Sequence, residues 1–236
     1  MLIFAHRGAS GYAPENTMPA FELAREMGAG GIETDIQVSK DGVLVLVHDT
    51  KVDRTSNGTG NVADFTWQEL SALDAGGWFD ARFAGERIVR LDQFLDWAIP
   101  NPLEPASLVL CLEIKAPAAT EATIEALAAR GLTARPDLQL SSFDWDAAVR
   151  AHTALPGLVV GFLTPRFDKA EIERVLNAGL PQICPRADLL TPEMVTLAHE
   201  RGLNVRAWGV GTREHLKLVY DCGADGTTLN WPDWAH

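Results

Sequence analysis

Residues 31–49, GIETDIQVSKDGVLVLVHD, combine an apolar run that carries Glu33 and Asp35 with a second apolar run that ends at His48. Short apolar runs bounded by glycine and polar residues are typical of β-strands. Side chains two residues apart on a strand point to the same face, so we expect Glu33 and Asp35 to face one side together. The stretch therefore predicts a buried strand with two carboxylates on one face.

The same arrangement of an apolar run followed by charged residues recurs twice. His6 and Arg7 follow the run LIFA, and Glu113 and Lys115 close the run LVLCLEI. We expect the three carboxylates, two histidines and two cations to converge at the ends of neighbouring strands. Such a set suits a hard metal ion held beside a phosphate while histidines transfer protons.

The rest of the chain repeats apolar runs with helical patterns between them. Eight runs are predicted as strands: Leu2–Ala5, Gly31–Ile36, Leu108–Ile114, Leu138–Ser141, Leu158–Phe162, Gln182–Cys184, Asn204–Ala207 and Asp225–Leu229. Asp168 and Thr191-Pro192 are typical of helix starts. Alternating strands and helices with short connections predict a parallel sheet, and eight units favour a closed α/β (β/α)8 TIM barrel.

One interval breaks this alternation. Residues 43–90 contain one strand-like run, a turn cluster and several aromatic residues, before the second helix at 91–99. We predict a single domain, 1–236, with 43–90 as a small insertion between the second strand and second helix. The insertion is expected over the carboxyl-end face of the barrel, its aromatic residues forming either its own core or a pocket wall. Few residues follow Leu229, so the last helix is missing or short.

Composition excludes several classes of partner. The net charge of −12 argues against nucleic acid and against stable association with anionic membranes. The three cysteines have no CxxC spacing and are expected to be reduced core residues, which favours a cytoplasmic location. No apolar run reaches the ~18 residues of a membrane span, and the N-terminus lacks the basic flank of a signal peptide. The oligomeric state stays open.

The carboxylates admit two interpretations. Buried close together, Glu33, Asp35 and Glu113 would repel one another unless a divalent cation joined them. Their oxygen donors indicate one divalent cation, Mg²⁺ or Ca²⁺. The alternative is a set of rim salt bridges with Arg7 or Lys115.

The histidines and cations also admit two interpretations. His6 and His48 suit an acid–base pair, because imidazole titrates near neutral pH, although a single histidine after a strand is more often structural. Arg7 and Lys115 suit a phosphate, and Lys115 could instead only neutralise Glu113. The remaining four histidines receive no role.

Several longer stretches carry a resemblance to a known family. They are AHRGASGYAPENTMPAF (5–21), GIETDIQVSKDGVLVLVHD (31–49), DRTSNGTG (53–60) and LEIK (112–115), with weaker matches at 140–143, 205–210 and 223–226. On these motifs the chain resembles the glycerophosphodiester phosphodiesterase family, of the PI-phospholipase-C-like TIM-barrel superfamily, in its bacterial cytosolic type.

The resemblance implies metal-dependent hydrolysis of small-molecule glycerophosphodiesters to sn-glycerol 3-phosphate and an alcohol. By position, it implies acid–base roles for two histidines, metal ligation by three carboxylates and phosphate contacts for two cations. These sets are His6 and His48; Glu33, Asp35 and Glu113; and Arg7 and Lys115. It leaves open which histidine is the acid, and whether water or the substrate's own hydroxyl attacks. Trp208 is expected either to bind substrate or to pack in the barrel.

The chain departs from the family's pattern in two places, at Ile88–Leu91 and at Leu229–Pro232, where the family usually has IPTL and TDxP. We expect neither departure to touch the acid–base or metal residues, and expect both to affect substrate choice. Two alternative functions stay open. One is a phosphodiesterase acting on lipids, of the lysophospholipase D or sphingomyelinase D kind; the other is a non-catalytic barrel that binds phosphodiesters.

Overall fold

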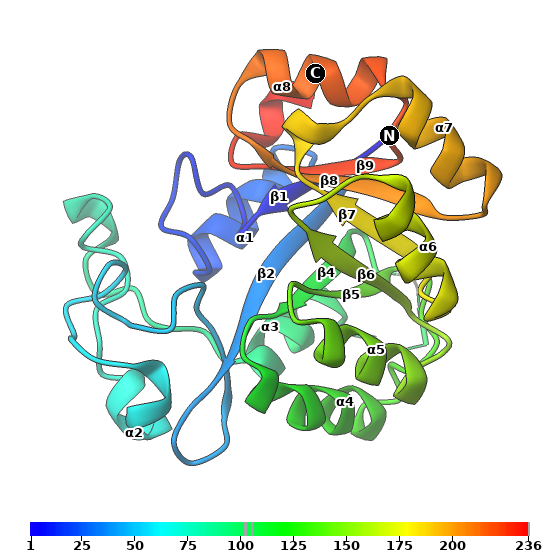
Figure 1. Ribbon diagram of the computed structural model, residues 1–236. Helices are drawn as coiled ribbons and strands as arrows, with labels where there is room; N and C mark the ends of the chain where they lie inside the picture. The colour runs from blue at the N-terminus through cyan, green and yellow to red at the C-terminus, as the bar shows by residue number, and fades with distance from the viewer. Residues whose placement is uncertain (102, 105, 236) are drawn as a thin grey trace.

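A closed barrel of parallel strands forms the body of the protein in the computed structural model, which describes residues 1–101, 103–104 and 106–235 (Figure 1). Its eight parallel strands are β1 (Leu2–His6), β2 (Gly31–Val38), β4 (Val109–Ile114), β5 (Leu138–Ser142), β6 (Val159–Thr164), β7 (Gln182–Pro185), β8 (Asn204–Val210) and β9 (Gly226–Leu229). The strand β1 pairs with β2 on one side and with β9 on the other, which closes the barrel. The predicted (β/α)8 barrel is confirmed.

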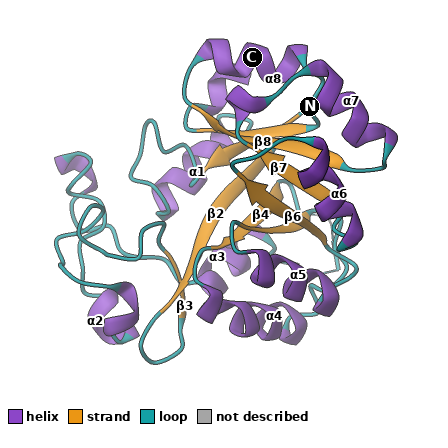
Figure 2. Ribbon diagram, in the orientation of Figure 1, coloured by secondary structure: helices purple, strands orange, loops and turns teal. Residues whose placement is uncertain are grey.

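Helices follow the strands and surround the barrel (Figure 2). They are α1 (Met18–Glu26), α3 (Leu91–Ala98), α4 (Thr120–Ala129), α5 (Trp145–Ala154), α6 (Lys169–Asn177), α7 (Pro192–Glu200) and α8 (Arg213–Asp221). The expected helix starts are capped, because Asp168 accepts a hydrogen bond from the Glu171 amide and Thr191 accepts one from the Met194 amide. After β9 the described chain forms only the 3₁₀ turn η5 (Pro232–Ala235).

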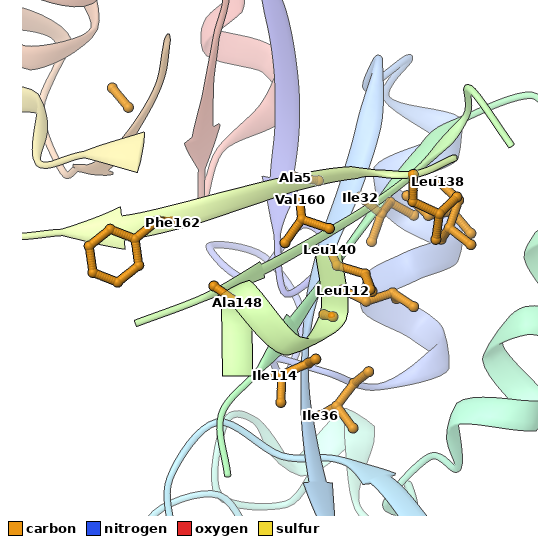
Figure 3. Close-up of a cluster of buried hydrophobic side chains, with 14 of the residues drawn as sticks. Ala5, Ile32, Ile36, Leu112, Ile114, Leu138, Leu140, Ala148, Val160 and Phe162 are labelled. Atoms are coloured by element: carbon orange, nitrogen blue, oxygen red, sulfur yellow. The ribbon is translucent and has the colours of Figure 1, made fainter. Parts of the chain in front are cut away.

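Strand alternation divides the side chains between two environments. Outward residues pack against the helices and form the main hydrophobic core. Figure 3 shows part of it, with Ile32 and Ile36 of β2, Leu112 and Ile114 of β4, Leu138 and Leu140 of β5, Val160 and Phe162 of β6, and Ala148 of α5. The inward residues of the same strands include Glu33 and Glu113, which line a cavity. The alternation thus fills the helix–sheet layer with apolar groups and leaves polar groups for the lumen.

The interval 43–90 forms a compact unit beside the barrel. It contains β3 (Leu44–Leu46), antiparallel to β2, and the short helices η1 (Val62–Asp64), α2 (Trp67–Leu70) and η2 (Ala81–Phe83). A small separate core holds it together, formed by Val45, Val47, Val52, Val62, Leu70, Ala75 and Ile88, with Phe65 and Trp67 packed against it. In Figure 1 this cyan segment lies to the left of the barrel.

Two arginines of this interval contact the loop between β1 and α1. Arg54 binds Glu15 with contacts of 2.7 and 2.8 Å, and Arg82 donates to the carbonyl of Tyr12 over 3.2 Å. The division into one domain with an insertion over the carboxyl-end face stays a prediction. These contacts nevertheless join the interval to a loop that starts at the carboxyl end of β1.

The three cysteines lie in the interior, and the helices are those of a globular barrel. Cys111, Cys184 and Cys222 are all buried and free. Across the described ranges, every helix is too short or too polar to cross a lipid bilayer.

Candidate active site

Two neighbouring strands bring the three carboxylates together. In the pairing of β2 with β4, Asp35 lies opposite Glu113, and Glu33 lies two residues earlier on the same face. One carboxylate oxygen of each residue lies within 4.8 Å of those of the other two. Asp35 is fully buried, and Glu33 and Glu113 are only 3% and 7% exposed. The predicted convergence of these side chains is therefore present.

The cluster is electrostatically costly without a cation. Burial, followed by repulsion from Asp35 and Glu113, raises the pKa of Glu33 well above its usual range. Burial and Asp35 likewise raise the pKa of Glu113 to about 7. Burial also acts to raise the pKa of Asp35, but the charges of Arg7, His48 and Lys115 outweigh it and hold that pKa low. A cation bound among the three carboxylates would offset this repulsion and favour their ionised forms.

The two predicted cations both lie against the carboxylates. Lys115 Nζ is 2.7 Å from Glu113 Oε1 and 3.9 Å from Asp35 Oδ1. Arg7 Nε is 3.1 Å from Asp35 Oδ2, and its Nη1 donates to Glu15 Oε1 over 2.8 Å. The salt bridges foreseen as the alternative interpretation are thus present. They do not exclude phosphate contacts, because Arg7 and Lys115 also line the cavity.

The loop after β1 supports Asp35 in a way that the sequence did not reveal. Arg7 and Asn16 both have left-handed backbone angles, with φ of 59° and 57°, and the Asn16 amide donates to the Arg7 carbonyl. This turn directs the buried Asn16 side chain toward β2, where its Nδ2 donates to Asp35 Oδ2 over 2.9 Å. Its Oδ1 accepts from Thr34 Oγ1. Asn16 therefore fixes the orientation of Asp35.

Both candidate histidines reach the same cavity. His48 Nδ1 lies 2.6 Å from Asp49 Oδ1. His6 Nδ1 lies 2.7 Å from Asn230 Oδ1, and His6 Nε2 is 3.9 Å from Glu33 Oε2. With both Nδ1 atoms engaged by acceptor oxygens, each Nε2 is left for the cavity.

Asn230 corrects one of our expectations. The departure at 229–232 was expected to touch none of the acid–base residues, yet Asn230 binds the ring of His6. The reason is barrel closure, which places the end of β9 beside the end of β1. Desolvation of the ring, assisted by the charge of Arg7, lowers the pKa of His6 to about 4, so the residue is neutral at pH 7.

Replacing Asn230 by aspartate is expected to raise the pKa of His6. A carboxylate that accepts from Nδ1 favours the charged imidazolium, so protonation should begin well above pH 4. The acidic limb of activity that reports His6 should move to higher pH. The His6 ring protons can be titrated by NMR in the wild type and in Asn230→Asp.

A control for the added negative charge is Asn57→Asp, on an exposed loop of the 43–90 interval. It should leave the His6 titration unchanged. An unshifted His6 midpoint in Asn230→Asp would contradict the assigned contact.

The cavity that these residues line has a volume of about 370 Å³. On its wall, Phe143 and Trp208 meet edge to face with ring centroids 5.0 Å apart, and Trp208 Nε1 donates to the Thr164 carbonyl. Arg206 of β8 also lines the cavity, is 2% exposed, and has an Nη2 without a hydrogen-bond partner. Trp208 thus contacts β6 and also lines the cavity, and its role in substrate binding stays a prediction.

The donor set fits a divalent metal ion. Glu33 Oε2 and Asp35 Oδ1 are buried oxygens with no hydrogen-bond partner, an arrangement that is costly unless a cation binds them. Carboxylate oxygens are the ligands that Mg²⁺ and Ca²⁺ prefer. Glu33, Asp35 and Glu113 are therefore the residues that could hold such an ion.

Several residues that support the site were assigned no role from the sequence, because they do not stand at the end of an apolar run. Glu15, Asn16, Asp49, Arg54, Phe143, Arg206 and Asn230 belong to this set. A closed barrel does imply that the ends of the first and last strands are neighbours, which could have revealed Asn230. Glu15, Asn16, Asp49 and Arg54 lie within the family motifs at 5–21, 31–49 and 53–60, and these motifs were the available signal for them.

Comparison with known proteins identifies the family. The model of the glycerophosphoryl diester phosphodiesterase family matches residues 6–234. A glycerophosphodiester phosphodiesterase of Caldanaerobacter subterraneus is 34% identical, over 98% of this chain and 95% of its own length. A crystal structure of an Agrobacterium tumefaciens glycerophosphodiester phosphodiesterase is 28% identical, covers 99% of this chain and 98% of its own, and has a TM-score of 0.85.

A further solved structure has a bound product. It is an Oleispira antarctica phosphodiesterase in complex with sn-glycerol-3-phosphate, 27% identical with a TM-score of 0.88, covering 99% of this chain and 94% of its own. The family match over nearly the whole chain agrees with the shared fold and with the motifs at the site. The chain therefore belongs to the glycerophosphoryl diester phosphodiesterase family.

Proposed function

We propose that the protein hydrolyses glycerophosphodiesters to sn-glycerol 3-phosphate and an alcohol. It would use one divalent cation, Mg²⁺ or Ca²⁺, held by Glu33, Asp35 and Glu113, with His6 and His48 as the acid–base pair. The observation that carries this proposal is the convergence of carboxylates, histidines and cations on one cavity. The substrate is carried over from the family and from the relative bound to sn-glycerol-3-phosphate.

An anionic substrate needs a positive field in the cavity, and a bound cation would supply it together with Arg7 and Lys115. The whole chain carries a net charge of −12, which repels a phosphodiester at long range. At the cavity, however, Arg7, Lys115 and Arg206 balance the charges of the carboxylate cluster, so that a bound cation would make the site positive. When bound, the cation supplies Lewis acidity toward the phosphoryl oxygens and lowers the pKa of the attacking oxygen. The local charge can thus favour phosphate although the protein as a whole is acidic.

The side chains of the cavity would perform proton transfer and substrate binding. His6 is neutral at pH 7 and is held through Nδ1 by Asn230, which leaves Nε2 able to accept a proton. His48 is held through Nδ1 by Asp49 and can exchange a proton at its own Nε2. Arg7 and Lys115 line the cavity and would bind the phosphate oxygens. Phe143 and Trp208 offer an apolar wall to the glycerol or to the departing alcohol.

A metal-titrated assay over three substrates tests this proposal. Glycerophosphocholine and glycerophosphoethanolamine, each with Mg²⁺ or Ca²⁺, should release glycerol 3-phosphate, and chelation should stop the release. Lysophosphatidylcholine, which carries an acyl chain, should be turned over more slowly. Faster turnover of lysophosphatidylcholine would instead indicate a lysophospholipase D. Binding without turnover of any substrate at saturating metal would indicate a non-catalytic barrel.

A further inference from the structure

Arg54 of the 43–90 interval lies one side chain away from His48. Its Nε donates to Asp49 Oδ2 over 2.7 Å, and the other oxygen of Asp49 lies 2.6 Å from His48 Nδ1. One carboxylate thus bridges the guanidinium and the imidazole. Since His48 and Asp49 are adjacent in the chain, their contact depends on the side-chain torsions of both residues, which Arg54 can restrict.

A second carboxylate holds the opposite edge of the same guanidinium. Arg54 Nη1 donates to Glu15 Oε2 over 2.7 Å, and Nη2 donates to Glu15 Oε1 over 2.8 Å. Glu15 belongs to the β1–α1 loop and is itself held by Arg7, which lies against Asp35. All three nitrogens of Arg54 are therefore committed: Nε to Asp49 of its own interval, and both Nη atoms to Glu15 of the barrel loop.

We propose that Arg54 is a positioning residue that sets the orientation of His48 through Asp49, using Glu15 as its anchor on the barrel. This inference rests on the proposed function in one respect: that function gives His48 a proton to transfer. Among the described residues, Arg54 belongs neither to the cavity lining nor to the carboxylate cluster. It acts through the geometry of another side chain.

The geometry favours positioning over simple stabilisation. The Arg54 side chain is 45% exposed, and exposed ion pairs contribute little to the free energy of unfolding. The planar guanidinium of arginine nevertheless fixes the orientation of a carboxylate, because its parallel N–H donors match the two carboxylate oxygens. The hydrogen bond from Arg54 also lowers the pKa of Asp49 to about 2. An ionised carboxylate can only accept a hydrogen bond, so Asp49 favours the His48 tautomer that carries its proton on Nδ1.

The competing explanation is that Arg54 only fastens the interval to the barrel. Arg82 offers a matched control, since it belongs to the same interval and donates to the carbonyl of Tyr12 in the same β1–α1 loop. Arg82 has no contact with His48, Asp49 or Glu15 among the hydrogen bonds of the described residues. A fastening role should respond similarly to the loss of either arginine, whereas a positioning role requires Arg54.

A double-mutant cycle tests the inference. Arg54→Met is expected to lower kcat by about 10- to 100-fold, the range found for groups that orient an active residue, whereas Arg82→Met should stay near wild type. In a His48→Ala background, Arg54→Met should lower kcat by less than about a further twofold, because the effects of two residues that act as one unit are not additive. The same factor of loss in both backgrounds, or equal losses for the two arginines, would overturn the inference.

A second measurement does not depend on turnover. Long-range proton–nitrogen NMR correlations of the His48 ring should show the Nδ1–H tautomer in the wild type and a mixture of tautomers in Arg54→Met. An unchanged tautomer in Arg54→Met overturns the inference even if the enzyme is active. A wild type that turns over no glycerophosphodiester overturns the proposed function, and the tautomer still decides the role of Arg54.

Discussion

Replacing His48 by alanine is expected to lower kcat for glycerophosphocholine by about 10²-fold or more, the usual contribution of a general acid or base. His6→Ala should cause a loss of similar size. Both side chains face one cavity, and each has its Nδ1 engaged by an oxygen acceptor, Asn230 for His6 and Asp49 for His48. In the proposed mechanism, removing either ring removes one of the two proton transfers. Steady-state release of glycerol 3-phosphate measures the effect.

Substrates with different leaving groups distinguish the general acid from the general base. A substrate that releases p-nitrophenol needs little protonation of its leaving group, so the variant that lacks the general acid should recover on it. The variant that lacks the general base should stay impaired. His199→Ala is the control, since His199 binds Asp225 outside the cavity. Near-normal activity in both His6→Ala and His48→Ala would remove the histidines from the mechanism.

Replacing Asp35 by asparagine is expected to weaken metal binding strongly and to lower activity by about 10²-fold or more. A catalytic cation supplies several kcal/mol of charge stabilisation, and each 1.36 kcal/mol corresponds to a factor of ten in rate. Asp35 is fully buried, holds one oxygen without a hydrogen-bond partner and lies within 4.8 Å of the other two candidate ligands. Calorimetric titration with Mg²⁺ or Ca²⁺ measures the loss of affinity directly.

The control for this substitution is another buried aspartate. Asp137 is 8% exposed and accepts hydrogen bonds from Arg135 over 2.8 and 2.6 Å, outside the cavity. Asp137→Asn removes a buried carboxylate from an arginine partner without touching the candidate ligands. It should keep its metal affinity and its activity. Unchanged metal affinity in Asp35→Asn would show that the three carboxylates are not the metal site.

The strands could be predicted because their signal is local. Each predicted run overlaps a strand of the barrel, since apolar residues between glycine and polar residues specify a buried strand within a few residues. Glu33 and Asp35 lie on the same face of their strand because side chains alternate with a two-residue repeat in any strand. The placement of Glu113 beside them needs only the pairing of neighbouring parallel strands, which is the common arrangement in an α/β barrel.

The supporting residues could not be predicted in the same way, because their contacts depend on the conformation of loops. Asn16 reaches Asp35 only because Arg7 and Asn16 both adopt left-handed backbone angles in the β1–α1 loop. Arg54 reaches Glu15 across 39 positions of sequence. No repeat of apolar residues encodes such contacts, since they arise only when the 43–90 interval packs against that loop.

The sequence by itself determined the α/β barrel and the identity of the charged residues at its strand ends, because strand patterns and side-chain alternation are properties of short segments. The tertiary structure alone decided which atoms meet. Barrel closure brings Asn230 to His6 across 224 positions, and the packing of the interval brings Arg54 to Glu15 across 39. Contacts of this kind depend on how distant segments pack, and no local pattern contains that information.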